Sequence, residues 1–586
     1  MIVADFEVFC KDWVLYGLDL ANQKEILIHN DKEALENVYN EYKKDIWIFF
    51  NGRNYDQYIF KAILCGFDPK EVNDFIILEG RKGYQFSRLF NNVPLTMFDI
   101  MPNPPVGLKT LEGFMGSDIR ETTVPFDIDR KLTPEELEEV IFYCRHDVEQ
   151  TALVLSKRLE EFTSQLELVK MFDMPRADMG KTKAQLSAKA LGAVRPLKSR
   201  EDEVNFSIPE TLKIKKYRFV VDWFIECREQ AVKYAEAWGI EPALDELYSQ
   251  KLECDIAGVP HVFAWGGIHG AIPNYCEKGY FVNVDVASYY PSLMIEYDYI
   301  SRNIKDPSHY KDMYKTRLAY KAKKDKRANP LKIVLNSTYG AMKDRYNPLY
   351  DPLQANNVCV AGQLLLLDLI EHLEPYVDIV QSNTDGILVK LRASNEAEAT
   401  REFERLDDLC YEWEKRSKMV LEFDEFRKVI QRDVNNYIIV AADGSYKSKG
   451  GVVKKLNDLD YDLPIVNRSV VAYLVKDAPV IRTVNESQDL RDFQKIVKVS
   501  SKYAFATHNG EQLTEKTFRV FASNRDTDGK ICKCKTVGAT EEKFANTPDK
   551  CFIDNSEVKG KALPSYLDKR YYIDLAEKRI KEFLGQ

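Results

Sequence analysis

The chain has 586 residues, of which 45% are hydrophobic and 30% charged, and its formal net charge is -9. This length provides for about three or four domains, and the composition is typical of a soluble globular protein. The negative total excludes a basic field over the whole surface, so a nucleic-acid partner would require a local concentration of Lys and Arg.

The 11 cysteines are scattered along the chain, which indicates reduced thiols of a cytoplasmic protein and not a disulfide framework. Cys532, Cys534 and Cys551 are the nearest to a cluster. One interpretation is that these cysteines bind a structural zinc ion, and the alternative is that they are ordinary cysteines of a hairpin. The N-terminus is interrupted by charges within its first residues, and we expect no apolar run of transmembrane length.

Strand and helix patterns alternate at the start of the chain. MIVADFEVF alternates like a strand, and DIWIFF (45–50) predicts a short buried strand followed by a helix. A long helix is predicted over 133–162, with Thr133 as its N-cap and Glu136 completing a capping box. Strands interleaved with helices predict an α/β domain over about residues 1–165.

The remaining elements follow in chain order. Residues 166–255 are polar and largely helical, and a strand-to-helix unit follows at 281–297. Residues 311–332 predict a basic helical stretch. Two β-prone runs then flank NTDG, which predicts a hairpin with its tip at 383–386. A helix over 571–585 ends the chain.

Two acids lie at the ends of predicted strands. Asp285 is the last polar residue of the alternating run VNVDV, and Ser288 begins the turn that follows it. Asp385 lies at the tip of the predicted hairpin, where a plain turn would also favour Asn, Asp and Gly. Metal-dependent phosphoryl transfer needs carboxylates from separate strand ends that converge on two divalent ions. Asp285 and Asp385 are therefore a candidate metal-binding pair.

One face of a predicted helix carries groups suited to a nucleotide. In LKIVLNSTYGAM (331–342), Lys332, Asn336 and Tyr339 share a face. Lys332 can hold a triphosphate as a point charge, Tyr339 offers a surface for a base pair, and Gly340 permits close approach of another group.

These segments resemble the family B DNA polymerases. DVASYYPS is similar to motif A, D-x-x-S-L-Y-P-S, with Tyr289 in place of Leu, and KIVLNSTYG is similar to motif B, K-x3-N-S-x-Y-G. NTDG stands where motif C has D-T-D-S. The order is that of the family, with 47 residues from Asp285 to Lys332 and 53 from Lys332 to Asp385. The resemblance implies an α/β and α+β multidomain protein with a right-hand polymerase of palm, fingers and thumb.

The resemblance also implies roles for single residues. The metal-binding positions would be Asp285, Val286 and Asp385. Tyr290 would pack under the sugar and disfavour a 2′-hydroxyl, Lys332 would bind the triphosphate with support from Asn336, and Tyr339 would line the nascent base pair. Arg317 and Lys321 resemble a basic pair that holds phosphates, although a solvated basic helix face is the alternative. Residues 311–332 carry nine Lys or Arg against two Asp, which supplies the local positive charge that DNA requires.

A second acidic set lies in the first 150 residues. Asp5 and Glu7 are two apart on a strand and face one side. With NGRNYD (51–56) and YCRHD (143–147) they resemble the exonuclease motifs of the same family, D-x-E, N-x2–3-(F/Y)-D and Y-x3-D. The resemblance implies an RNase H-like 3′→5′ exonuclease domain. Its metal-binding acids would be Asp5, Glu7, Asp56 and Asp147. Tyr143 would orient the attacking water, and Asn51 would contact the primer end, with Asn54 as the alternative.

Two further segments match the family in part. In FAWGGIHG, Gly266 and Gly267 match a Y-x-G-G element that contacts the template, but Ala264 stands at the Tyr position. After motif C, Tyr437 matches the Tyr of a K-x-Y motif that grips the primer, while Asn435 replaces its Lys. Lys447 and Lys449 are candidates for the missing phosphate contacts.

The resemblance implies a domain order. The predicted segments are an exonuclease domain over 1–165, connecting structure and the first part of the palm over 166–305, fingers over 306–345, the second part of the palm over 346–450, and a thumb over 451–586. The implied cofactors are two Mg²⁺ or Mn²⁺ ions per active site, with dNTP as substrate. The implied partners are primer-template DNA, single-stranded DNA at the exonuclease site and a helicase, primase or single-strand-binding protein. We expect a monomer without a membrane partner.

The compact chain is similar to viral and phage members, so we expect the cytoplasm of a host cell and no separate N-terminal domain. The spacings between motifs leave no room for the insertions of protein-primed members, which predicts ordinary primer extension. Three alternatives stay open. They are an exonuclease whose polymerase site has decayed, which Asn383 favours; a non-catalytic DNA-binding protein; and a primase-polymerase, against which Tyr290 argues.

Overall fold

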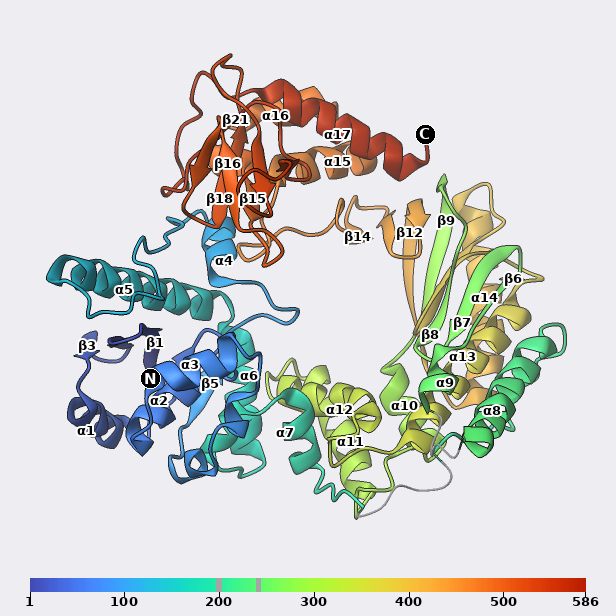
Figure 1. Ribbon diagram of the computed structural model, residues 1–586. Coiled ribbons are helices and arrows are strands. Elements are labelled where there is room, and N and C mark those ends of the chain that lie inside the picture. The colour runs from blue at the N-terminus through green and yellow to red at the C-terminus, as the bar shows by residue number, and fades with distance from the viewer. Residues whose placement is uncertain (197–202, 239–243) are drawn as a thin grey trace. The chain divides into compact units, whose positions relative to one another are not determined.

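The structure, a computed structural model, describes residues 1–196, 203–238 and 244–586 (Figure 1). Backbone contacts divide the chain into two compact units. The first unit comprises Met1–Lys181, Leu456–Ser469 and Val480–Ala576, and the second comprises Thr182–Lys455, Val470–Pro479 and Glu577–Gln586. Several sheets and 17 helices in the described ranges confirm the mixed α/β multidomain architecture.

The N-terminal part of the first unit is built on a five-stranded sheet of order β3-β2-β1-β4-β5. β1 is antiparallel to β2 and parallel to β4. The strands are β1 (Ile2–Val8), β2 (Trp13–Asp19), β3 (Lys24–His29), β4 (Trp47–Phe49) and β5 (Met97–Asp99). The helices are α1 (Lys32–Tyr42), α2 (Asp56–Cys65), α3 (Pro69–Ile77), α4 (Leu108–Met115), α5 (Pro134–Lys157), α6 (Leu159–Met171) and the 3-10 turns η1 (Gly83–Gln85), η2 (Arg88–Asn92) and η3 (Arg176–Gly180). Buried apolar side chains of β1, β4 and α2 form the core of this part.

Helix α5 begins as its capping residues predict. The hydroxyl of Thr133 accepts the N–H of Glu136, whose carboxylate accepts the N–H of Thr133. The single helix expected over 133–162 is divided, because Arg158 leaves helical geometry at φ -114° and ψ 20° and a second helix begins after it. α5 packs against β1 and β2, which places its inward face over the two acids of β1.

The C-terminal part of the first unit contains two small sheets, of orders β15-β18-β21 and β17-β16-β19-β20. Their strands are β15 (Lys495–Lys498), β16 (Phe505–His508), β17 (Glu511–Leu513), β18 (Thr517–Ala522), β19 (Ile531–Cys534), β20 (Glu542–Lys543) and β21 (Cys551–Ile553). The helices are α16 (Val480–Glu486), η4 (Leu490–Phe493), α15 (Pro464–Lys476) and α17 (Lys569–Leu584), the last two of which extend across the division between the units.

The three cysteines of this part are buried in β19 and β21. In the described ranges, Cys532, Cys534 and Cys551 are not among the side-chain groups close enough to share a metal ion. The alternative reading, cysteines that pack in strands, therefore accounts for them, and a zinc site is not supported.

The second unit is built on a nine-stranded sheet of order β14-β13-β12-β9-β11-β10-β8-β7-β6. The strands are β6 (Lys251–Ile256), β7 (Val259–Ala264), β8 (Gly267–Ala271), β9 (Tyr275–Val286), β10 (Asp378–Asn383), β11 (Gly386–Lys390), β12 (Leu421–Asp433), β13 (Asn436–Val440) and β14 (Tyr446–Lys449). The helices are α7 (Lys183–Ala190), α8 (Arg218–Trp238), α9 (Leu244–Ser249), α10 (Tyr289–Glu296), α11 (Ser308–Ala322), α12 (Ala328–Lys343), α13 (Pro352–Leu373) and α14 (Glu396–Ser417).

Two helices of this unit differ from expectation. The basic stretch 311–332 is not one helix, because α11 ends at Ala322 and α12 begins at Ala328. α13 is the one helix in the described ranges that is long and apolar enough to cross a membrane, which departs from the expectation that no such run exists. Its apolar composition has another cause, since 94% of its most apolar window is buried inside the protein.

Candidate active sites

Asp285 and Asp385 lie together at one edge of the nine-stranded sheet. β9 runs between β11 and β12, and Asp285 is paired with Gly386 on one side and Glu422 on the other. Asp385 lies in the turn that joins β10 to β11, as the hairpin pattern predicts. The N–H of Val286 donates to the main-chain oxygen of Asp385 over 2.8 Å, which joins the two acidic segments directly.

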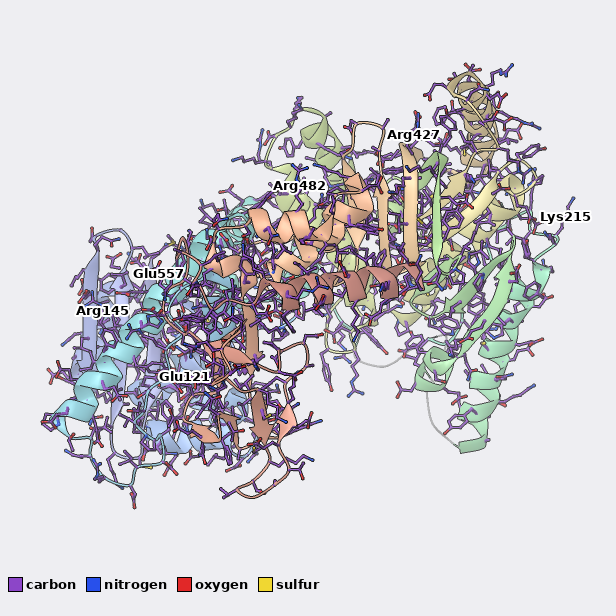
Figure 2. All side chains as sticks on the ribbon, turned by 90° about the horizontal axis from the view of Figure 1, so that it is seen from above. Glu121, Arg145, Lys215, Arg427, Arg482 and Glu557 are labelled. Atoms are coloured by element: carbon purple, nitrogen blue, oxygen red, sulfur yellow. The ribbon has the colours of Figure 1, made fainter. Side chains whose placement is uncertain are left out.

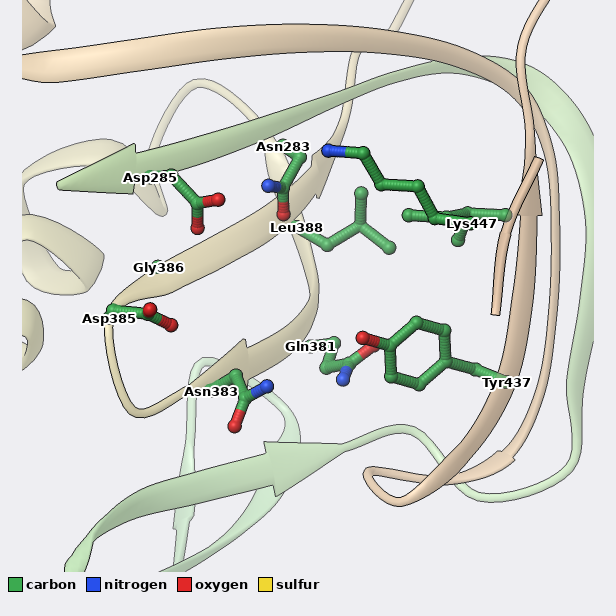
Figure 3. Close-up of a pocket in the computed structure, with 10 residues that line it drawn as sticks. Asn283, Asp285, Gln381, Asn383, Asp385, Gly386, Leu388, Tyr437 and Lys447 are labelled. Atoms are coloured by element: carbon green, nitrogen blue, oxygen red, sulfur yellow. The ribbon is translucent and has the colours of Figure 1, made fainter. Parts of the chain in front are cut away.

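The two acids face a cavity of about 160 Å³ (Figure 3). Asn383, Gly386, Tyr437 and Lys447 also line it. The residues come from β9, from the β10–β11 hairpin and from the β13–β14 hairpin, so three segments far apart in the sequence build one pocket. Tyr437 and Lys447, predicted to contact DNA, thus lie beside the predicted metal-binding acids.

Burial and the charge of Asp385 raise the pKa of Asp285 to about 6, and Lys447 opposes this shift. The ammonium group of Lys447 is 2.7 Å from a carboxylate oxygen of Asp424. Asp285 is half-buried and Asp385 is exposed. Two neighbouring carboxylates of like charge repel one another, and a divalent cation relieves this repulsion. Because the donors are carboxylate oxygens, the pair suits Mg²⁺ or Mn²⁺.

The turn of the hairpin has room only for a glycine at position 386. A Cβ atom at this position would lie 1.9 Å from Oδ1 of Asp285, so the carboxylate occupies the space that any other side chain would need. Asn383 serves the turn itself, because its Oδ1 accepts the N–H of Thr384 over 3.0 Å. The amide therefore shapes the hairpin that presents Asp385.

The turn after β9 carries backbone strain next to the acids. Ser288 adopts a left-handed conformation with φ +51°, which a residue with a side chain rarely adopts and which proteins retain mainly at functional sites. From α11, Nη1 of Arg317 donates to Oγ of Ser288 over 3.1 Å. Lys321 of the same helix lies 3.8 Å from Glu422, the residue paired with Asp285. The predicted basic pair thus reaches the end of β9.

Tyr290 and Tyr339 come together as a stacked pair, with ring centroids 4.4 Å apart. Tyr290 lies in motif A, on α10, and Tyr339 lies in motif B, on α12, so the stack joins the two motif-bearing helices. Lys332 and Asn336 lie exposed on α12. Their predicted contacts with a triphosphate stay predictions.

The glycines of FAWGGIHG lie beside the acidic hairpin. A Cβ atom at Gly267 would lie 3.3 Å from Cγ2 of Thr384, so the turn between β7 and β8 packs against the turn that holds Asp385. Phe263 and Trp265, which flank the place of the family's Tyr, are both buried in the core. Lys449 pairs with Tyr437 across β13 and β14.

The four acids of the second set also converge. Asp5 and Glu7 lie on β1, Asp56 is the first residue of α2, and Asp147 lies on α5. Burial, with the charge of Asp147, raises the pKa of Asp5 to about 8, and burial raises the pKa of Asp147 to about 6. The pKa values of Glu7 and Asp56 are raised well above the ordinary range, first by burial and then by Asp5.

This cluster fits a hard divalent cation. Oδ1 of Asp56 is buried and has no hydrogen-bond partner, so it has a lone pair available for a metal ion. Ligand atoms of Asp5, Glu7 and Cys144 lie within 4.8 Å of one another. Burial and the charges of Asp147 and Glu7 also raise the pKa of Tyr143, which keeps its hydroxyl protonated as a hydrogen-bond donor.

A cation that the sequence did not reveal lies inside this cluster. Lys109 of α4 forms an ion pair with Asp147, and its Nζ is 3.1 Å from Oε1 of Glu112 and 4.5 Å from the ring centre of Tyr143. The charges of Asp147 and Glu112 raise the pKa of Lys109 despite its burial. Lys109 and Glu112 stand three apart in LKTLE, a spacing that could have indicated their common face.

The two candidates for the primer contact interact with each other. Nδ2 of Asn54 donates to Oδ1 of Asn51 over 2.8 Å, and the N–H of Asn51 donates to Asp99 over 3.0 Å. Asn51 has a left-handed backbone with φ +67°. The choice between Asn51 and Asn54 stays open.

Known proteins match a part of this chain. DNA polymerase 1 of Saccharolobus solfataricus is 26% identical over 197 residues, which are 33% of this chain and 20% of that protein. DNA polymerase 1 of Sulfurisphaera ohwakuensis is 25% identical over 199 residues, 33% of this chain and 21% of that protein. The chain thus spans about a fifth of the length of these relatives, and the resemblance to DNA polymerases is confirmed over about a third of the chain.

The chain was also compared with solved structures and with family models. The family B DNA polymerase of Pyrobaculum calidifontis covers 100% of this chain and 77% of its own, with 14% identity and a TM-score of 0.40, which is too low to support a conclusion. No family model matches the chain.

Proposed function

We propose that this chain is a family B DNA polymerase that extends the 3′-hydroxyl of a primer on a DNA template, with a 3′→5′ exonuclease that removes mispaired ends. The observation that carries the proposal is the pocket in which Asp285, Asp385, Tyr437 and Lys447 meet. The order of the three motifs and the similarity to two DNA polymerases over a third of the chain support it. The replication context that we propose is of viral or phage type, in the cytoplasm of the host.

In the polymerase site, Asp285 and Asp385 would hold two Mg²⁺ ions, with the main-chain carbonyl of Val286 as a further ligand. Such ions stabilise the attacking and leaving oxygens of an in-line phosphoryl transfer. Arg317 and Lys321, which reach Ser288 and Glu422 near the end of β9, would hold the phosphates of the incoming dNTP. The stacked Tyr290 and Tyr339 would form the floor under its sugar and base.

In the exonuclease site, Asp5, Glu7, Asp56 and Asp147 would hold the ions that activate water for hydrolysis. Tyr143, whose pKa is raised by burial and by the charges of these acids, would keep its hydroxyl proton and orient that water. Lys109 balances the negative charge of Asp147 and fixes the direction in which this carboxylate points. The fold would thus hold two metal-dependent sites, one in each unit.

A single assay tests both sites. Wild type and the variants Asp285→Ala, Asp385→Ala and Asp5→Ala are given a recessed primer-template, Mg²⁺ and dNTPs, with Asp443→Ala in an exposed turn as the control. The first two variants should lose extension and keep digestion of single strands, and Asp5→Ala should do the reverse. Extension by Asp285→Ala at the wild-type rate would overturn the proposed polymerase site.

A nuclease with a decayed polymerase site is the second candidate, because Asn383 stands where the family pattern has Asp. It predicts that wild type digests DNA and never extends a primer, and that Asn383→Asp restores extension. A non-catalytic DNA-binding protein predicts that neither reaction occurs.

We also propose that synthesis starts from an ordinary primer, because the short spacings between the motifs leave no room for the insertions of protein-primed members. Addition of a nucleotide to a purified terminal protein, with no primer present, would contradict this.

A further inference from the structure

The end of α4 and the residues that follow it are hydrogen-bonded to the C-terminal part of the first unit. We call this stretch, residues 113–121, the seam segment. The N–H of Ile119 donates to the carbonyl of Asn555 over 2.7 Å, and the carbonyl of Gly116 accepts the N–H of Val558 over 3.0 Å. These contacts join parts of the chain that are more than 400 residues apart.

Two further hydrogen bonds of the seam segment involve Glu557 and Glu121, which are labelled in Figure 2. The N–H of Glu557 donates to Oδ1 of Asp118 over 2.6 Å, and a carboxylate oxygen of Glu121 accepts the N–H of Lys516 over 2.7 Å. The seam segment is therefore hydrogen-bonded along most of its length to the C-terminal part.

Arg519 closes the end of α4. The last carbonyls of a helix have no partner within the helix and must find donors elsewhere. Arg519 is completely buried, and its Nη2 donates to the carbonyls of Ser117 over 2.6 Å and Gly113 over 3.4 Å. Its Nη1 donates to the carbonyl of Ser556 over 2.5 Å, so one guanidinium group joins α4 to the C-terminal part.

Arg491 binds the same helix end. Its Nε and Nη2 donate to the carbonyl of Phe114 over 3.0 and 2.5 Å. A Cβ atom at Gly116 would lie 2.9 Å from Cδ of Arg491, so the arginine packs closely over the left-handed glycine that ends α4. Two cations at the C-terminus of a helix also complement its dipole.

The other part of α4 reaches into the candidate exonuclease site. Glu112 is completely buried, its Oε1 lies 3.1 Å from Nζ of Lys109, and its Oε2 accepts the N–H of Arg120 over 3.3 Å. Lys109 in turn forms the ion pair with Asp147. α4 has eight residues, so a displacement of its C-terminal end displaces Lys109 as well.

We propose that Arg519 and Arg491 are positioning residues of the exonuclease site: by holding the C-terminal end of α4, they keep Lys109 and Glu112 in place against Asp147. The inference rests on the proposed exonuclease function. The C-terminal part of the first unit would then be a component of the exonuclease site. Arg519 and Arg491 act through α4 and not by contact with the four acids. The exonuclease site would be complete only when the C-terminal part is packed against α4.

The test uses the full chain with the variants Arg519→Met and Arg491→Met, and with Arg519→Lys as the conservative variant. Arg525→Met is the matched control, because Arg525 lies in the same part and pairs with Asp528, away from α4. Digestion of single-stranded DNA is measured as kcat and KM, primer extension is measured in parallel, and hydrogen exchange is followed for the amides of α4.

For both Met variants we expect kcat of digestion to fall by about 10- to 100-fold, the range for partners that orient a metal-binding group, with an unchanged KM. Extension should be unchanged, the amides of α4 should exchange faster, and Arg519→Lys should recover part of the loss.

Digestion and α4 exchange that match those of Arg525→Met would overturn the proposal. If Arg519→Met unfolds the first unit, Arg491→Met decides, and a wild-type kcat in that variant overturns the proposal. If the wild type digests no DNA, the proposed exonuclease function fails. Exchange of the α4 amides then still shows whether the arginines hold the helix, and protection equal to wild type in both Met variants overturns the positioning role.

Discussion

Gly386 is the position at which the smallest change should have the largest effect on primer extension. It stands where the family pattern has Ser, and it faces Asp285 across β9 and β11. The substitution Gly386→Ala adds a single methyl group and leaves every charge in place. Any loss of activity would therefore report the position of the Asp285 carboxylate.

The structure sets the size of the expected effect. The new Cβ would lie 1.9 Å from Oδ1 of Asp285 and 2.8 Å from the carbonyl oxygen of Val284. Non-bonded heavy atoms approach to about 3.5 Å, so the carboxylate must withdraw by more than about 1 Å. A misplacement of about 1 Å at a reacting centre costs about 100-fold in rate. This corresponds to about 2.7 kcal/mol of transition-state stabilisation.

The assay is single-nucleotide addition to a recessed primer at saturating Mg²⁺ and dNTP. Gly451→Ala is the control, since a Cβ at that position meets no atom within 4 Å. Digestion of single strands should be unchanged in both variants, because its acids lie in the other unit. Addition by Gly386→Ala at the wild-type rate would refute the reasoning, because it would mean that Asp285 need not lie over this glycine.

Three other predictions follow from the acids. In EDTA, the pKa of Asp5 is raised from 3.8 to about 8, so the contribution of Asp5 to the free energy of unfolding is fully present below about pH 4 and is lost as the pH rises through about 8. Urea unfolding should show this slope, Asp5→Asn should flatten it, and Mg²⁺ should restore stability at pH 8; an equal slope in Asp5→Asn would contradict this. Lys109→Ala should reduce digestion by about 10- to 100-fold and leave extension unchanged, whereas a loss of both would indicate unfolding. Asn383→Asp adds a negative charge beside Asp285 and Asp385, so half-saturation by Mg²⁺ in extension should fall several-fold; an unchanged titration would rule out that effect.

The acidic pairs could be located from the sequence because their positions are set by local structure. The alternation of VNVDV places Asp285 at a strand end, and NTDG between two β-prone runs places Asp385 at a hairpin tip. The capping box at Thr133 fixes the start of α5 and hence the face that carries Asp147. Each of these signals lies within 14 residues of the acid that it positions.

Other features depend on contacts between distant segments, which no local pattern encodes. Lys109 and Glu112 belong to the acidic cluster only because α4 packs beside α5. In the sequence, Gly386 has only the features of an ordinary turn residue. Its special requirement arises because the carboxylate of Asp285, on another strand, lies against it. The two aromatic residues beside Ala264 are in the core, where neither could replace the family's Tyr. The domain assignments and the roles of the site residues stay predictions.

The division of the first unit has a consequence for synthesis of the protein. The carbonyl of Gly113, which already accepts the N–H of Gly116, receives a further donor from Arg519, which the ribosome adds 406 residues later. At about 5–20 residues per second this interval is roughly 20–80 s. The second unit is encoded almost entirely between these points, so it can fold while the end of α4 still lacks its contacts with Arg519. On stalled nascent chains, we expect α4 to stay sensitive to proteases until Arg519 has left the ribosome.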